Sequence, residues 1–180
     1  MSNFYKAGKA AMTSNKDDWE TPQELFDKLN AIYDFTLDAA ASDSNAKCDN
    51  YFTIKEDGLK QKWSGRVFCN PPYGRSMREW IKKASDEAKN CEVIVMLIPA
   101  RTDTTYFHDY IYKKKNVEVE FLRGRLKFED KGIAKNPCPF PSMIVVMKGG
   151  GCVNVANNEE NLVSLADRMT VKTYKGGAIE

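Results

Sequence analysis

Val93-Ile94-Val95-Met96-Leu97-Ile98 is an unbroken apolar run in the middle of this 180-residue chain. A run of this length predicts a β-strand, and Pro99 ends it because proline lacks the backbone donor that a sheet ladder needs. The run shows no alternation of apolar and polar residues. We therefore expect the strand to be buried on both faces, as strands are in a parallel sheet covered by helices.

Further strands and helices alternate on both sides of this run. The other predicted strands cover residues 35–41, 67–70, 117–122 and 143–147. One predicted helix begins at Thr21-Pro22, a second begins at Ser76 and ends near Asn90, and a third covers residues 103–112. Strand, loop and helix in alternation predict an α/β fold with a doubly wound sheet. Residues 42–65 and 123–141 are expected to be irregular.

Capping residues mark the starts of the first two helices. We expect Thr21 to cap the first helix and Pro22 to occupy its first position. Ser76-Met77-Arg78-Glu79 has the pattern of a capping box. The inward faces are predicted to carry Leu25, Phe26, Leu29 and Ile32 in the first helix, and Trp80, Ile81, Ala84 and Ala88 in the second.

The composition is that of a soluble globular domain, with 42% hydrophobic and 29% charged residues. The net charge of +2 says little about nucleic acid, but lysines and arginines cluster after residue 73, at 113–115 and at 123–127. Such clusters are either solvated faces or phosphate contacts. The five cysteines form no CxxC pair, which favours free thiols in a reducing cytoplasm. The single histidine excludes a His-rich metal site, and no metal is expected.

Asn70-Pro71-Pro72-Tyr73 follows a predicted strand and carries the clearest chemical signal. Proline fixes φ and forces the preceding residue into extended geometry, so two prolines make a stiff loop with outward carbonyls. The Asn70 side chain adds an acceptor and Tyr73 a flat ring. Together they suit a planar substrate that bears an amino group, such as adenine. A plain turn with a packed tyrosine is the structural alternative.

Asp38 and Asn70 both stand at the carboxyl ends of predicted strands. Ligands of open α/β sheets bind in the crevice beyond these strand ends. This placement is a second, independent argument that both residues belong to a site.

At this point the chain resembles the phage-type DNA N-6-adenine methyltransferases over roughly residues 17–147. The resemblance is carried by the order of short motifs rather than by any one of them. These motifs are Trp19-x-Thr21-Pro22, Leu37-Asp38-Ala39-Ala40, Asp57-Gly58-Leu59 with Trp63, Asn70-Pro71-Pro72-Tyr73, residues 97–100 (Leu-Ile-Pro-Ala), and Gly124-Arg125-Leu126-Lys127-Phe128. It implies a Rossmann-like methyltransferase sheet, mostly parallel, with an antiparallel last strand.

The resemblance implies S-adenosylmethionine as the methyl donor. The helix start at Thr21-Pro22, with Trp19, would border the donor site, and Asp38 with Ala39 and Ala40 would lie beside the amino-acid end of the donor. A carboxylate at a strand end is a good acceptor for an ammonium group. Asp57 would approach the adenine amino group of the donor; its structural alternative is a turn former, and that of Asp38 is a helix cap.

The sequence departs from the wider methyltransferase pattern after the first strand. Ala39, Ala40 and Ala41 stand where glycines usually permit close backbone approach. The segment from Asp38 to Asp57 is also short for a helix, a second strand and their turns. The acidic residue that usually holds the donor ribose is not evident, and Asp49 and Glu56 remain as alternatives.

The resemblance implies double-stranded DNA as partner, with the target adenine flipped out of the duplex. Asn70 and the Pro71 carbonyl would then accept hydrogen bonds from its amino group, and Pro72 would stiffen the loop. Tyr73 would stack on the base, and Phe128 or Phe140 would close its opposite face, with Phe128 favoured. Phosphates would be held by arginines on both flanks, namely Arg75, Arg78, Arg123 and Arg125.

Other functions stay open at this stage. The same loop suits the side-chain amide of glutamine in a protein, or an RNA base, and a relative without activity would still bind DNA. We expect an N-terminal arm (1–18), a methyltransferase domain (19–148) and a polar extension (149–180), with no membrane segment. The expected location is the cytoplasm, that of a bacterial host if a phage or prophage encodes the chain. The oligomeric state, a homo-oligomer included, and the recognition sequence stay open.

Overall fold

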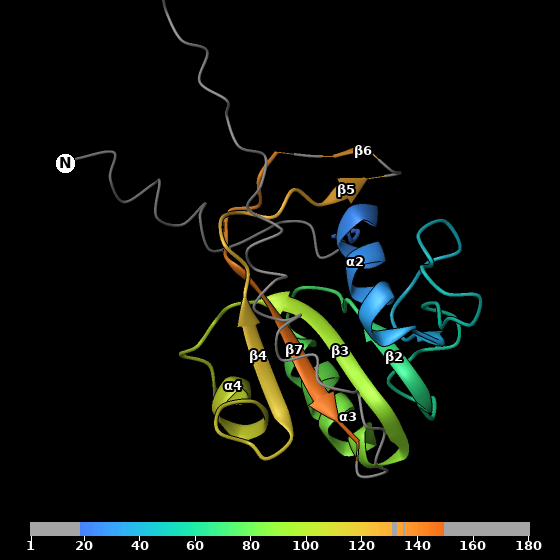
Figure 1. Cartoon of the computed structure of the whole chain (residues 1–180), viewed down its shortest axis with the longest axis vertical. Helices are drawn as coiled ribbons and strands as arrows, with labels where there is room; N and C mark the ends of the chain where they lie inside the picture. The colour runs from blue at the N-terminus through green and yellow to red at the C-terminus, as the bar shows by residue number, and fades with distance from the viewer. Residues whose placement is uncertain (1–18, 131–132, 135, 150–180) are drawn as a thin grey trace, which may run out of the picture.

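The computed structural model describes residues 19–130, 133–134 and 136–149 (Figure 1). Its centre is a five-stranded sheet in the order β1-β2-β3-β7-β4. The strands are β1 (Leu37–Asp38), β2 (Gly65–Cys69), β3 (Cys91–Pro99), β4 (Val117–Phe121) and β7 (Ser142–Lys148). A separate two-stranded sheet joins β5 (Glu129–Asp130) to β6 (Ile133–Ala134).

The strand directions confirm a mixed α/β fold with a mostly parallel sheet. β1, β2 and β3 pair in parallel, whereas β7 is antiparallel to both β3 and β4. β4 therefore runs in the same direction as β1, β2 and β3. The last strand is the antiparallel one, as the resemblance implies.

β3 lies at the centre of the sheet, between β2 and β7, and forms the heart of the core. Every residue from Val93 to Pro99 is buried. Burial on both faces was expected from the unbroken apolar run, and the prediction is confirmed. The strand is longer than residues 93–98, because Cys91 already pairs with Gly65 and Pro99 still pairs with Ser142.

Helices cover the sheet through aromatic and aliphatic side chains. They are α2 (Gln23–Tyr33), α3 (Met77–Glu87), the 3-10 turn η1 (Ala88–Asn90) and α4 (Thr105–Tyr110). Phe26 of α2 packs edge-on against Phe68 of β2, with ring centroids 5.3 Å apart. In Figure 1, α3 lies behind β3 and β7. α4 is shorter than the predicted helix over 103–112.

The predicted caps of the first two helices are wrong in detail. Pro22, not Thr21, is the N-cap residue of α2, and its carbonyl accepts from the backbone N–H of Leu25 and Phe26. The exposed N–H of Gln23 finds a distant partner instead, the Glu129 carboxylate at 3.2 Å. Ser76 does precede α3, but its side chain makes no capping hydrogen bond.

The segment between β1 and β2 explains the short spacing from Asp38 to Asp57. The predicted strand over 35–41 reduces to Leu37–Asp38. The chain then turns back without a helix, and Tyr51 forms a parallel bridge with Asp38. The N–H of Asp38 donates to the Asn50 carbonyl, and the N–H of Phe52 donates to the Asp38 carbonyl, each at 2.9 Å. Residues 50–52 thus pair with β1 at the edge of the sheet, as an edge strand would.

The segment over 123–141, which was expected to be irregular, includes two short strands among its described residues. It contains the β5–β6 hairpin, which its charged and proline-rich composition did not predict. Glu129 of this hairpin forms an antiparallel bridge with Glu20, with its N–H 2.9 Å from the Glu20 carbonyl. The hairpin therefore holds the segment that leads into α2.

Four of the five cysteines lie in the described residues, namely Cys48, Cys69, Cys91 and Cys138, and all four are free thiols. Across the described ranges, the model has no helix long and apolar enough to cross a membrane. The predicted arm over 1–18, almost all of the extension over 149–180, and the helix predicted near 159–168 lie outside the described residues. The division into domains stays a prediction.

Candidate functional site

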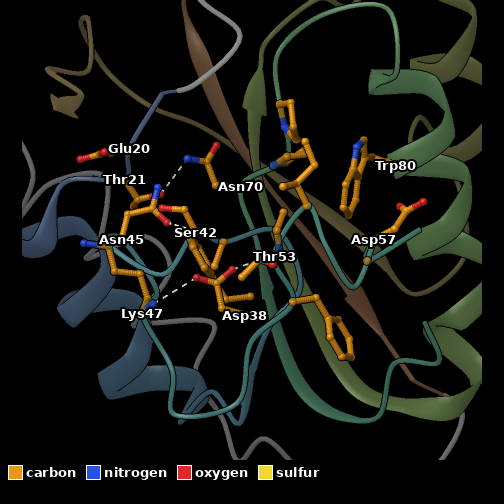
Figure 2. A pocket seen from close by; sticks show the side chains of 18 of the residues that line it. Glu20, Thr21, Asp38, Ser42, Asn45, Lys47, Thr53, Asp57, Asn70 and Trp80 are labelled. Atoms are coloured by element: carbon orange, nitrogen blue, oxygen red, sulfur yellow. Dashed lines mark hydrogen bonds between the residues drawn. The ribbon is translucent and has the colours of Figure 1, made fainter. Parts of the chain in front are cut away.

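A cavity of about 580 Å³ opens at the carboxyl ends of β1 and β2 (Figure 2). Four stretches of chain line it, within residues 19–21, 38–47, 52–59 and 68–80. Its volume lies within the range of roughly 300–1,000 Å³ that is typical of small-molecule sites. The prediction that Asp38 and Asn70 share a site is consistent with this geometry, since both line the cavity.

Asp38 is a buried carboxylate held by the loop that follows it. Its Oδ1 accepts from the N–H of Ala40 at 3.3 Å and its Oδ2 from the N–H of Lys47 at 3.2 Å. Burial raises the pKa of Asp38 to about 6, against the opposing effect of these two N–H groups and of the Lys47 charge. A buried carboxylate at the edge of a cavity is suited to meet a cationic group.

Asn70 presents an oriented amide at the other side of the cavity. Its Nδ2 donates to the Trp19 carbonyl at 2.5 Å and to Thr21 Oγ1 at 2.9 Å. A carbonyl oxygen can only accept, so the atom that faces Trp19 must be the nitrogen. Oδ1 points away from Thr21 (Figure 2), is buried and has no hydrogen-bond partner among the described residues. A buried acceptor without a donor is costly, and its presence points to a ligand.

Tyr73 and Phe128 are buried in an aromatic cluster, as the structural alternative of a packed tyrosine predicts. The Tyr73 hydroxyl donates to the Leu97 carbonyl at 3.2 Å, and burial raises its pKa well above the usual value. Its ring lies 5.8 Å from that of Phe128 and 5.6 Å from that of Phe140. Trp19 completes the cluster, 5.2 Å from Phe128 and 5.5 Å from Phe140. We call these four rings the aromatic quartet.

Asp57 lines the cavity and also forms the turn that the structural alternative predicts. Its φ is 58°, and its carboxylate accepts from the N–H of Leu59 at 3.3 Å and pairs with Lys60 at 2.9 Å. The hydrogen bond from Lys60 lowers the pKa of Asp57. The turn fixes the direction of this carboxylate at the wall of the cavity.

Gly58 supplies the close approach that Ala39 and Ala40 cannot. A Cβ at Gly58 would lie 2.2 Å from the Ala39 carbonyl and 3.0 Å from the Trp80 ring. The turn over 57–58 therefore packs directly on the end of β1 only because residue 58 is glycine. The sequence shows this glycine, but not that it takes the place of glycines after the first strand.

The cavity wall includes most of the predicted donor-site residues. Trp19, Thr21, Asp38, Ala40 and Asp57 line it, as do Asn70, Pro71 and Pro72. Two others do not: Pro22 caps α2, and Ala39 is fully buried with its N–H on the Phe68 carbonyl at 2.9 Å. Neither ribose alternative lines the cavity. The Glu56 carboxylate instead accepts from the N–H of Thr53 at 2.9 Å. A different acidic residue, Asp43, lines the wall.

Several lining residues were not predicted from the sequence. Apolar ones are Phe52, Ile54, Leu59 and Trp80, and polar ones are Ser42, Asn45, Lys47 and Thr53. Ile54 is 94% exposed at the rim, an unusual position for a large apolar side chain. An isoleucine in a polar loop was the available signal. Trp80 was assigned to the core by its helical spacing, and it serves both roles.

The four predicted DNA-contacting arginines lie outside the cavity wall, and all four are exposed. Arg78 pairs with Asp109 at 3.1 Å. Arg123 and Arg125 lie in the loop between β4 and the hairpin. In the part of the chain that the structure describes, no three His, Cys, Asp or Glu side chains gather as a metal site would require.

The model of the DNA N-6-adenine-methyltransferase (Dam) family matches residues 8–169, most of the chain. The chain belongs to this family. The match covers β1, the cavity wall and the Asn-Pro-Pro-Tyr loop, so the family resemblance inferred from the motifs is confirmed.

Two curated proteins resemble shorter stretches of the chain. The "DNA N-6-adenine-methyltransferase" of Escherichia phage T1 is 36% identical over 95 residues, which are 51% of this chain and 40% of the phage protein. The "Putative methyltransferase YfdM" of Escherichia coli (strain K12) is 37% identical over 65 residues, 32% of this chain and 71% of that protein. The match to the phage protein thus spans less than half of its length.

Proposed function

We propose that this protein transfers a methyl group from S-adenosylmethionine to the exocyclic 6-amino group of adenine in DNA. The observation that carries the proposal is the buried, unpaired Oδ1 of Asn70 at the edge of the cavity. Membership of the Dam family supports adenine in DNA as the substrate, and the phage T1 relative carries the same activity in its name.

The cavity fits the proposed donor in size and in chemistry. The Asp38 carboxylate would hold the ammonium group of the donor, and Asp57 its adenine amino group, with Trp19, Thr21 and Ala40 along the wall. The unpredicted apolar residues Phe52, Ile54, Leu59 and Trp80 supply surface for a flat ring. When bound, S-adenosylmethionine supplies an electrophilic methyl group on a sulfonium centre.

Asn70 is suited to the acceptor amine because its free atom is an oxygen. The 6-amino lone pair of adenine is delocalised into the ring, which makes the nitrogen a weak nucleophile. Asn70 Oδ1 and the Pro71 carbonyl would accept from the two amino hydrogens and stabilise the positive charge that develops on nitrogen. Asn70 is neutral and cannot take the proton, which would leave to water. Pro71 and Pro72 keep the acceptors rigid, so little reorganisation accompanies the reaction.

The target base would leave the duplex, at a cost of a few kcal/mol of lost stacking. Tyr73 would recover part of this by stacking, but only after Phe128 or Phe140 moves aside, because both rings pack against it. Arg75, Arg78, Arg123 and Arg125 would hold phosphates around the flipped nucleotide. Such contacts fix the position of the DNA without reading its sequence.

The same proposal extends to the fold and the setting. We infer a doubly wound, Rossmann-like sheet, in which α2 covers the Phe68 face of β2 and α3 covers the opposite face. Residues 19–148 would form the methyltransferase domain, flanked by the arm and the extension. The DNA would be that of a bacterial cytoplasm, which the phage relative supports.

The proposal is tested by offering labelled S-adenosylmethionine with unmethylated duplex DNA, RNA and protein in separate reactions. Nucleosides are then identified by mass spectrometry. We expect N6-methyladenine from DNA alone, and none from the Asn70→Ala variant. Label in protein or RNA but not in DNA would refute the proposed substrate. Methylcytosine would refute the adenine assignment, and DNA binding without donor binding in calorimetry would refute the enzyme.

A further inference from the structure

The amide of Asn70 is held by two atoms that lie about fifty residues before it in the sequence. The Trp19 carbonyl and Thr21 Oγ1 both accept from its Nδ2, across separations of 51 and 49 residues. Thr21 is 3% exposed, so water does not compete for its hydroxyl. Its neighbour Pro22 is the N-cap residue of α2, and the Thr21 hydroxyl accepts from Asn70.

The two partners have different effects on the amide. The Trp19 carbonyl sets its orientation because it can only accept, whereas the Thr21 hydroxyl fixes its position. If the side chain flipped, Oδ1 would face the Trp19 carbonyl and lose that hydrogen bond, and Nδ2 would take the place of the free acceptor. In that orientation the nitrogen would point two hydrogens at an incoming amine. The flipped amide would repel the group that the proposed reaction has to polarise. Which atom of Asn70 faces the substrate therefore decides whether the site can work.

The two acceptors are themselves fixed by distant contacts. The Trp19 ring belongs to the aromatic quartet, and the Glu20 carbonyl between the two acceptors receives the N–H of Glu129. Residues 19–21 are thus clamped by the β5–β6 hairpin and by Phe128 and Phe140. A rigid platform of this kind can impose one orientation on an amide that would otherwise rotate.

We propose that Thr21 is a positioning residue, whose hydroxyl, with the Trp19 carbonyl, holds the Asn70 amide so that Oδ1 is the atom presented to the substrate. The inference rests on the proposed function. It assigns to the Thr21 hydroxyl an action through Asn70, while the residue keeps its place along the wall of the cavity, which Thr21→Val preserves in shape. It also makes the segment before α2 part of the acceptor half of the site.

The test compares Thr21→Val, which removes the hydroxyl and keeps the shape, with Thr21→Ser, which keeps the hydroxyl. We expect Thr21→Val to lower kcat about tenfold, as the loss of one buried hydrogen bond would. The Kd for S-adenosylmethionine should change by less than about twofold, and Thr21→Ser should restore kcat. Thr36→Val is the matched control, since its half-buried hydroxyl bonds Arg66 and does not line the cavity.

A second readout does not depend on methyl transfer. In the ¹⁵N-labelled protein, the side-chain NH₂ signals of Asn70 are identified by their absence from Asn70→Ala. Two hydrogen bonds should slow their exchange with solvent in the wild type and in Thr21→Ser, and exchange should quicken in Thr21→Val. A higher Kd for the donor in Thr21→Val, with unchanged kcat and unchanged amide exchange, would show that Thr21 binds the donor and would overturn the inference.

The two proposals fail in different ways. If the wild-type chain transferred no methyl group, the proposed function would fall, and the amide signals would still decide the orienting role. Faster exchange in Thr21→Val would support that role even then. Unchanged exchange would overturn it, whatever the activity of the wild type.

Discussion

The two sides of the cavity are built in opposite ways. Asp38 is held by N–H groups two and nine residues ahead of it, on the loop that follows its own strand. Asn70 is held by groups 51 and 49 residues before it, on a segment that the β5–β6 hairpin clamps. The Asp38 side, proposed to bind the donor, is local, whereas the Asn70 side, proposed to bind the acceptor, exists only when distant parts of the chain have come together.

This difference indicates that donor binding and acceptor binding should be separable by mutation. The two hydrogen bonds of Asp38 come from its own loop and are not shared with residues 19–21. Changes to Asn70 or its platform leave both hydrogen bonds of Asp38 in place. Distant sites without shared partners usually contribute independently to free energy.

The largest effect is expected from Asn70→Ala, which removes the free acceptor and nothing on the Asp38 side. The developing charge on the amine would lose a preorganised partner, and such losses lower kcat by about 100- to 1,000-fold. The Kd for S-adenosylmethionine, measured by calorimetry, should stay within about threefold of the wild type. Asn90→Ala is the matched control, because Asn90 bonds Glu87 on the surface. An equal loss of donor binding would contradict the separation of the two sides.

Asp38→Asn should act on the other side, and somewhat less strongly. The substitution keeps the shape but removes the charge that would meet the ammonium group of the donor. We expect the Kd for S-adenosylmethionine to rise about 10- to 100-fold, since hydrogen bonds to charged groups are worth about 1.5–3 kcal/mol. With saturating donor, kcat should recover most of its wild-type value. A variant that lost kcat while it kept donor affinity would reverse the proposed roles.

The pH dependence of donor binding should follow the protonation of the Asp38 carboxyl. The pKa of Asp38 lies at about 6 because of its burial, so the carboxyl is protonated below this value and cannot pair with an ammonium group. The affinity for S-adenosylmethionine should therefore increase about tenfold from pH 5 to pH 7. Asp38→Asn should flatten this profile. His108→Gln should leave the profile unchanged, because His108 is exposed on α4 and does not line the cavity.

The free energy of unfolding of the protein without donor should fall as pH rises, whereas the affinity for the donor should increase. The pKa of Asp38 rises from 3.8 to about 6 on folding. Between these values the folded chain holds a proton that the unfolded chain has released. The contribution of Asp38 to the free energy of unfolding thus falls as pH rises through this window, and the full cost is present above pH 6. Comparing denaturant midpoints of the wild type and Asp38→Asn across this window checks the sign. A contribution that grew with pH would contradict a cost of burial that outweighs the hydrogen bonds of this carboxylate.

The local side of the cavity is also the side that the sequence predicts better. Asp38 and Asp57 follow from strand ends, turn signals and motif order, because their neighbours in space are their neighbours in the chain. β3 was predicted for the same reason, since an unbroken apolar run marks a central strand wherever it occurs. Gly58 was visible as a turn residue, but its packing on the Ala39 carbonyl was not, because that contact depends on how β1 and the turn meet.

The Asn70 side of the cavity was predicted less well, because its contacts join residues that lie far apart in the sequence. Thr21 was expected to cap α2, a local role that its residue type favours, and a partner 49 residues away took its hydroxyl instead. Tyr73 and Phe128 were expected to stack on a flipped base, and in the structure both rings are buried against other rings, an arrangement that aromatic side chains favour. The β5–β6 hairpin was missed because its two-residue strands carry almost no periodic pattern.

The smallest effects are expected from the arginines around the site, which are proposed to contact DNA outside the cavity. Arg123→Ala and Arg125→Ala should each weaken binding to duplex DNA a few-fold and reduce the slope of affinity against salt concentration by about one, as the loss of a single phosphate contact would. Arg78→Ala should have less effect, because Arg78 already pairs with Asp109 at 3.1 Å and would have to give up that partner to reach a phosphate. Lys89→Ala, on the surface within η1, serves as a control for the loss of one positive charge. Binding measured at several salt concentrations would refute the assignment if Lys89→Ala changed the slope as much as Arg125→Ala. The loop over 123–141 would then owe its place in the site to the clamp on residues 19–21 rather than to contact with DNA.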